Sequence, residues 1–133
     1  MSILVFIIGC LIGSFLNVCI YRIPKHETVV FGRSHCMSCQ KEIKWYDMIP
    51  VISYLILGGR CRYCKEKLSL QYPCIELLNG LAYFVLYRIF GLELLCLITC
   101  VVFSILLVFV MIQLNKKVDS MNAVRTMEEE NSK

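Results

Sequence analysis

Two pairs of cysteines, each with the spacing Cys-x-x-Cys, lie in one basic segment between hydrophobic stretches. The first pair is Cys36 and Cys39, and the second is Cys61 and Cys64. Four thiolates in two close pairs can surround one Zn²⁺ tetrahedrally, and residues 40–60 are long enough to bring the pairs together. Four thiolates leave no open coordination position, so we expect a structural metal. A redox-active dithiol is the alternative interpretation.

The residues that follow each cysteine pair bear on this interpretation. Gln40 and Lys65 directly follow the second cysteine of their pairs, at positions where glycine would make a left-handed turn easier. Several lysines and arginines surround the cysteines, and they would offset the net negative charge of one Zn²⁺ with four thiolates. We therefore prefer zinc despite the missing glycines.

Composition places these cysteines beside a membrane. Of the 133 residues, 58% are apolar, which is typical of a membrane protein. Residues 2–21 and 94–115 contain no charge, and residues 73–90 contain only Glu76 and Arg88. Because a helix needs about 20 apolar residues to cross a bilayer, we expect three transmembrane helices. The sequence thus predicts an all-α, multi-pass membrane protein with a four-cysteine, zinc-ribbon-like loop.

The distribution of charge predicts the orientation. Residues 22–71 hold nine lysines and arginines against four acids, a net charge of +5. By the positive-inside rule, this loop is cytoplasmic and the N-terminus lies outside. Because the cytoplasm is reducing, the cysteines of the loop should remain thiols, which favours a metal over a disulfide. The first segment lacks the basic start and cleavage site of a signal peptide, so we expect it to be retained. The expected units are a first transmembrane helix (1–21), a cytoplasmic zinc-binding loop (22–72), the second and third transmembrane helices (73–115) and a polar cytoplasmic tail (116–133) that is frayed or disordered.

Small and polar residues on the first segment share one helical face. Gly9 and Gly13 form a small-xxx-small pattern that lets another helix approach closely. Asn17 follows one turn later and needs a hydrogen-bond partner in a dry environment. Packing is the preferred role of the glycines, whereas packing and a site both stay open for Asn17.

Glu76 lies one turn inside the second segment, where a carboxylate is costly unless it is paired. It is either a functional residue or a structural one near a helix N-terminus, with Arg22 or Arg60 as its partner. The segment 41–60 is less polar than a solvated loop, so we expect it at the membrane interface or packed against the cysteine loop. In the third segment a small-residue stripe predicts helix packing: Cys96, Cys100 and Ser104.

Together these residues resemble the opening of the type IV prepilin peptidases, from about Gly9 to Leu81. The resemblance implies a bifunctional enzyme of the bacterial cytoplasmic membrane. Such enzymes cleave the leader of type IV prepilins and pseudopilins, and then N-methylate the new terminus with S-adenosylmethionine. The zinc-bearing loop belongs to the N-terminal, methyltransferase-type portion. Besides the cysteine pairs, the matching motifs are Gly13-Ser-Phe-Leu-Asn-Val18, Tyr21-Arg-Ile-Pro24, Trp45-Tyr-Asp47, Ile49-Pro50-Val51, Ser53-Tyr54-Leu55, Gly59-Arg-Cys61, Tyr72-Pro73 and Glu76-Leu77.

The peptidase aspartates of that family are not found at their expected places. Gln113 occupies the position of the first, and Asn115 replaces a carboxylate that often follows it. The second belongs to a later Gly-x-Gly-Asp motif, which this sequence does not contain. Aspartic proteolysis needs two carboxylates that share a proton. We therefore expect no catalytic peptidase residues here and no prepilin cleavage by this chain alone.

Three functions stay open. The first is a methyltransferase-type portion that uses S-adenosylmethionine. The second is a non-enzymatic zinc module that docks a prepilin or pseudopilin peptide for a full-length paralogue or a C-terminal peptidase half, and the third is a thiol oxidoreductase. The lipid bilayer is an expected partner, whereas nucleic acid is not, because the charge adjoins membrane. The substrate-binding candidates are Asn17, Arg22, Pro50, Tyr54 and Glu76.

Overall fold

The chain is helical throughout most of its length. The computed structural model describes residues 1–28, 30, 35–36 and 38–133. Within these ranges it has no β-strand, and three helices are long and apolar enough to cross a membrane, which confirms the predicted all-α multi-pass fold. The elements are α1 (Ser2–Arg22), the 3₁₀ helices η1 (Ile23–Lys25) and η2 (Trp45–Met48), α2 (Ile52–Ile56), α3 (Gln71–Phe90) and α4 (Leu94–Asn131).

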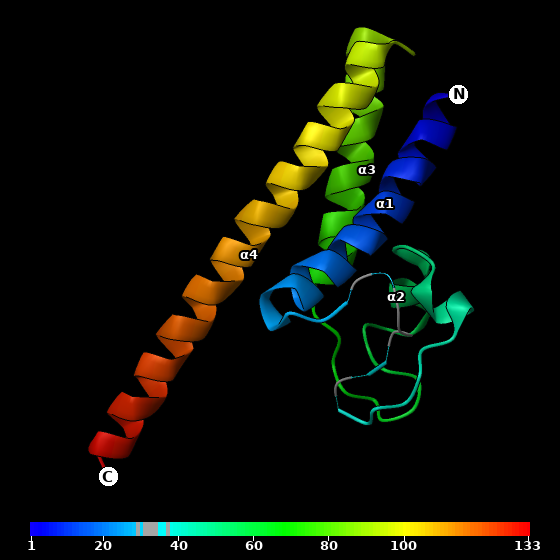
Figure 1. Cartoon of the computed structure of the whole chain (residues 1–133). Coiled ribbons are helices and arrows are strands. Elements are labelled where there is room, and N and C mark those ends of the chain that lie inside the picture. The colour runs from blue at the N-terminus through cyan, green and yellow to red at the C-terminus, as the bar shows by residue number, and fades with distance from the viewer. Residues whose placement is uncertain (29, 31–34, 37) are drawn as a thin grey trace.

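Glycines bring the backbones of α1 and α3 together. A Cβ on Gly9 would lie 2.7 Å from the Cα of Gly80, and one on Gly13 would lie 2.8 Å from the Cα of Glu76. No larger side chain fits at such distances without moving a helix. Figure 1 shows α1 and α3 side by side, with α4 along them. The predicted small-xxx-small packing is confirmed, and α3 is its partner.

A polar network lies inside the three-helix bundle. Asn79 is fully buried and donates from Nδ2 to the carbonyl of Gly9 at 2.7 Å. Ser104 Oγ donates to Asn79 Oδ1 at 3.2 Å, and the Tyr83 hydroxyl lies 2.9 Å from Ser104 Oγ. The stripe that ends at Ser104 is buried, as predicted. No role for Asn79 was predicted from the sequence. An amide inside the apolar part of α3, three residues after Glu76, could have indicated a hydrogen bond between helices.

Helix α4 is longer than the sequence predicted. It continues to Asn131, so the expectation of disorder for residues 116–133 is wrong for all but its end. Its 38 residues span about 57 Å, whereas the hydrocarbon core of a bilayer is about 30 Å thick. The prediction rested on polarity, but the segment is rich in good helix formers and extends a helix that is already nucleated. Its C-terminal half projects away from α1 and α3 (Figure 1).

The connection between α1 and α3 folds beside the C-terminal half of α1 (Figure 1). It contains η2 and α2, which carry apolar side chains on their surface. Trp45, Leu55 and Ile56 are 76%, 71% and 73% exposed. This exposure favours the first of the two expectations for residues 41–60, a position at the membrane interface, over burial against the cysteines.

Candidate metal centre and adjoining cavity

The two cysteine pairs adopt the same backbone turn. The N–H of Gln40 donates to the carbonyl of Cys36 at 2.9 Å, and the N–H of Lys65 donates to that of Cys61 at 3.2 Å. Gln40 and Lys65 have φ values of 59° and 61°. Both positions therefore have the expected left-handed conformation, although neither is glycine.

These turns bring four sulfur atoms together. The Sγ atoms of Cys36, Cys39, Cys61 and Cys64 all lie within 4.8 Å of one another. The Cys36–Cys64 distance is 3.6 Å, and the Cys39–Cys61 distance is 4.0 Å. A tetrahedral ion with metal–sulfur bonds of about 2.3 Å needs sulfurs about 3.8 Å apart, whereas a disulfide needs about 2 Å. The four cysteines could therefore hold one metal ion.

The thiols of this cluster ionise unequally. Hydrogen bonds from the backbone N–H groups of Cys39 and then Ser38 lower the pKa of Cys36 to about 6. The N–H of Glu66 also favours the thiolate of Cys64, but desolvation and the neighbouring thiols outweigh it and raise the pKa of Cys64 to about 12. One thiolate thus opposes ionisation of the next. A bound cation would remove this opposition, since metal binding releases the thiol protons.

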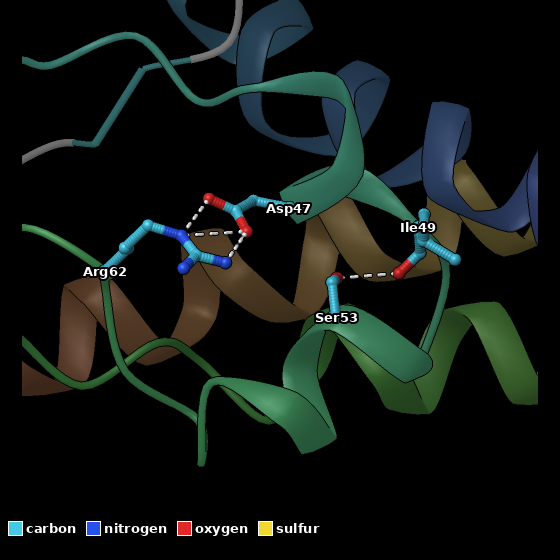
Figure 2. A network of polar contacts seen from close by, with 4 residues as sticks. All are labelled: Asp47, Ile49, Ser53 and Arg62. Atoms are coloured by element: carbon cyan, nitrogen blue, oxygen red, sulfur yellow. Dashed lines mark hydrogen bonds and ion pairs between the residues drawn. The ribbon is translucent and has the colours of Figure 1, made fainter.

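An ion pair ties the second cysteine turn to η2. Arg62 lies between Cys61 and Cys64, and its Nε and Nη2 donate to the two carboxylate oxygens of Asp47 at 2.9 and 2.7 Å. The Asp47 side chain is only 6% exposed, and hydrogen bonding by Arg62 lowers its pKa. Figure 2 shows this fork-like contact. A paired guanidinium and carboxylate fix geometry as well as charge, so η2 is held in place by the cysteine turn.

The same figure shows how η2 leads into α2. Ser53 Oγ donates to the carbonyl of Ile49 at 2.6 Å, which closes the turn between the two short helices (Figure 2). Val51, between them, has φ 61° and ψ −50°, which is a strained γ-turn conformation for a β-branched residue. Its N–H donates to Glu76 Oε2 at 2.7 Å. The strained turn therefore places the backbone N–H of Val51 within hydrogen-bond distance of the Glu76 carboxylate on α3.

The predicted partners of Glu76 were wrong. Among the described residues this backbone N–H donates to the Glu76 carboxylate, the Ser14 side chain lies nearby, and neither Arg22 nor Arg60 bonds to that carboxylate. The reason is register. Glu76 packs against Gly13, and Arg22 lies nine residues farther along α1, or about 13 Å.

A cavity of about 530 Å³ lies between α1, the cysteine loop, α2 and the start of α3. Cys36 lines this cavity, so the four-cysteine cluster adjoins it. Pro50 is outside the wall but flanks the strained turn, and Gln113 is exposed on α4, also outside the wall. Of the predicted substrate-binding residues, the structure brings four together in the wall: Asn17, Arg22, Tyr54 and Glu76.

Asn17 is the most buried of these four. It is 3% exposed, and its Nδ2 donates to the carbonyl of Tyr72 at 3.0 Å. Its Oδ1 is buried and has no hydrogen-bond partner in the part of the chain that the structure describes. Asn17 thus helps to join α1 to the start of α3, and it also leaves one acceptor unused beside the cavity.

Residues 7–90 match the family described as the bacterial peptidase A24 N-terminal domain. The chain belongs to this family. It is 43% identical over 90 residues to the prepilin leader peptidase/N-methyltransferase of Myxococcus xanthus, a match covering 68% of this chain and 27% of that protein. The enzyme of the same name from Bacillus subtilis is 34% identical over 107 residues, covering 80% and 43%. The Vibrio cholerae enzyme is 43% identical over 79 residues, covering 53% and 31%.

The A24 N-terminal match contains every part of the site. It includes most of α1, both cysteine pairs, η2, α2 and α3, and it stops before α4. The chain spans less than half of the length of each of these curated relatives. No solved structure matches the chain.

Proposed function

We propose that this chain receives the amino-terminal segment of a type IV prepilin or pseudopilin, as part of a prepilin leader peptidase/N-methyltransferase. The cavity carries the proposal, because one wall is an apolar face of α1 and another is the cysteine loop. A peptide helix could lie against Leu11, Phe15 and Val18 while its polar end reaches Asn17 and Glu76.

The metal in this proposal is zinc, held by Cys36, Cys39, Cys61 and Cys64. All four ligands are thiolates, which zinc prefers, so the ion would supply rigidity and would not bind substrate. Rigidity matters here because Arg62, between two of the ligands, positions Asp47 of η2. The ion would thereby stabilise the loop wall of the cavity.

Methyl transfer is the reaction that we assign to the cavity, with S-adenosylmethionine as the donor. The names of the relatives include N-methyltransferase activity. A bound ammonium would first give up a proton to water, and the neutral amine would then form the N–C bond as the C–S bond of the donor breaks and S-adenosylhomocysteine leaves. The protein's contribution to such a reaction is to hold the amine in line with the methyl group and to exclude water. Arg22 and Tyr54 line the space in which the two reactants would meet.

A second candidate is docking without methyl transfer, and it is favoured because the sequence contains no glycine-rich nucleotide-binding loop. In both candidates the amide of Gln113 cannot share a proton with a partner carboxylate, so the peptidase aspartates would come from another segment or subunit. A C-terminal peptidase half or a full-length paralogue would supply them. In this candidate the zinc loop and the cavity only present the peptide.

The location follows from the charge pattern. We propose the bacterial cytoplasmic membrane, with the N-terminus outside and the loop at residues 22–72 in the cytoplasm. The helices at 1–21 and 73–115 would cross the bilayer, and the polar helical tail at 116–133 would extend into the cytoplasm.

Binding experiments with the full chain in nanodiscs test these proposals. We expect one zinc per chain, saturable binding of a peptide with the apolar amino-terminal segment of a type IV pilin, and a weaker peptide complex for Leu11→Ala than for Ile7→Ala. Ile7 is a matched control because it is exposed on the same helix but does not line the cavity. Methylation of the peptide with S-adenosylmethionine would select the first candidate, and binding without methylation the second. Absence of peptide binding would contradict both, and an intact dithiol–disulfide cycle without zinc would favour the oxidoreductase.

A further inference from the structure

The cavity wall contains a buried carboxylate without a cationic partner. Glu76 is 7% exposed, and it meets the Val51 N–H and the Ser14 side chain. Arg22 and Lys67 also line the cavity, but neither forms an ion pair with Glu76 among the described residues. A buried carboxylate in a membrane protein is costly unless a positive group accompanies it. A cationic ligand would supply that group.

Asn17 places a second acceptor next to this carboxylate. Glu76 packs against Gly13 of α1, and Asn17 is one helical turn beyond Gly13, on the same face. The Asn17 Nδ2 donates to the Tyr72 carbonyl, whereas the buried Oδ1 has no hydrogen-bond partner among the described residues. The Glu76 carboxylate and the unpartnered Asn17 Oδ1 are both hydrogen-bond acceptors. The ligand must therefore bring N–H groups as well as positive charge.

The remaining wall of the cavity defines the rest of the ligand. Leu11 and Phe15 of α1 line the cavity and are about half exposed, on a helix that crosses the membrane. Apolar surface at this position faces hydrocarbon or a hydrocarbon-like chain. The polar end of the ligand thus continues into an apolar chain.

We propose that the cavity binds a primary ammonium group at the end of an apolar chain, with its N–H groups on the Glu76 carboxylate and Asn17 Oδ1. The inference deepens the proposed function, and it rests on that function where the ligand is the amino-terminal segment of a pilin peptide. An aminophospholipid carries the same chemistry. A quaternary ammonium has the charge but no N–H group, and an acetylated amine has neither charge nor three donors. Recognition should therefore fall for both of them.

Equilibrium binding of labelled peptides to the full chain in phosphatidylcholine nanodiscs measures this preference. Three peptides share one apolar sequence and end in a free amine, an acetyl group or a trimethylammonium group. We expect the free amine to bind at least about tenfold more tightly than the other two, because a charge-assisted hydrogen bond is lost in each. Glu76→Gln keeps the size of the side chain and should remove the preference. Glu93→Gln, a carboxylate in the turn between α3 and α4, should retain it.

Each outcome separates this inference from the proposed function. Equal binding of the three peptides would overturn the ammonium site and leave peptide docking in place. Binding of no peptide, together with Glu76-dependent retention of phosphatidylethanolamine over phosphatidylcholine during purification, would assign the site to lipid and refute docking. Binding of neither would overturn both. The wild-type comparison needs no variant, so it remains decisive even if Glu76→Gln does not fold.

Discussion

Lys65 has a backbone conformation that an L-residue adopts at a cost. Its φ of 61° places it in the left-handed region, where a side chain costs about 1–2 kcal/mol. This conformation allows the N–H of Lys65 to donate to the carbonyl of Cys61, and that hydrogen bond closes the turn that brings the cysteines together. Strain and metal geometry are therefore linked at this residue.

Replacing Lys65 with glycine should tighten metal binding. Glycine relieves the left-handed strain but loses more entropy on folding, which leaves a net gain of about 0.5–1 kcal/mol. Since metal binding and loop folding are coupled, the affinity should rise about two- to fivefold. Competition with a chromophoric chelator measures it. Lys44→Gly is the control, because Lys44 is extended at φ −74° and gains nothing from glycine. Equal weakening by both changes would contradict the account.

The residue scale also shows what a single sequence can predict of the site. The four cysteines and the left-handed positions after them were predictable, because the chemistry is local to each Cys-x-x-Cys turn. The contact between Val51 and Glu76 was not, since 25 residues separate them and only the fold sets their distance. Tyr54 and Asn17 line the same cavity, and their role in substrate binding stays a prediction.

At the scale of elements, the register of α1 against α3 decides which residues meet. Gly13 sets this register, because a Cβ there would lie 2.8 Å from the Cα of Glu76. The apolar lengths of the helices were predictable from transfer energetics. The choice of partner helix was not, nor was the buried amide of Asn79 that bridges α1 and α4. The same is true of the helical extension of α4, which polarity alone did not reveal.

Gly13→Leu should separate α1 from α3. A larger side chain at a backbone contact costs about 1–3 kcal/mol through strain. The fraction of sodium dodecyl sulfate that unfolds the protein in mixed micelles should therefore fall. Ile7→Leu is the control, because Ile7 is exposed on the same helix and the change conserves volume. An unchanged unfolding midpoint for Gly13→Leu would show that α1 and α3 do not pack through this glycine.

At the scale of the whole molecule, the chain divides into three helices that are long and apolar enough to cross a membrane and a loop that gathers four cysteines. The backbone hydrogen bonds of α1, α3 and α4 are internal to each helix, so they do not depend on a metal. The described residues between Cys36 and Cys64 form only short helices, and the Asp47–Arg62 pair links them to the second cysteine turn. The cavity needs both parts, because its walls come from α1, α3 and this loop.

Metal removal should therefore weaken ligand binding while it preserves the long helices. After chelation we expect the far-ultraviolet helical signal to remain, and the emission of Trp45, the single tryptophan, to shift as η2 loses its position. Peptide affinity should fall by more than about tenfold, because the loop must then be ordered at the expense of binding energy. Substitution of one ligand tests the same point, and Cys36→Ser should reproduce this loss of peptide affinity. Cys74→Ser should retain the affinity, because Cys74 is an exposed residue of α3 outside the sulfur cluster. Loss of the helical signal on chelation would mean that the cysteine loop supports the whole bundle, and unchanged peptide binding would mean that the loop is not a wall of the site.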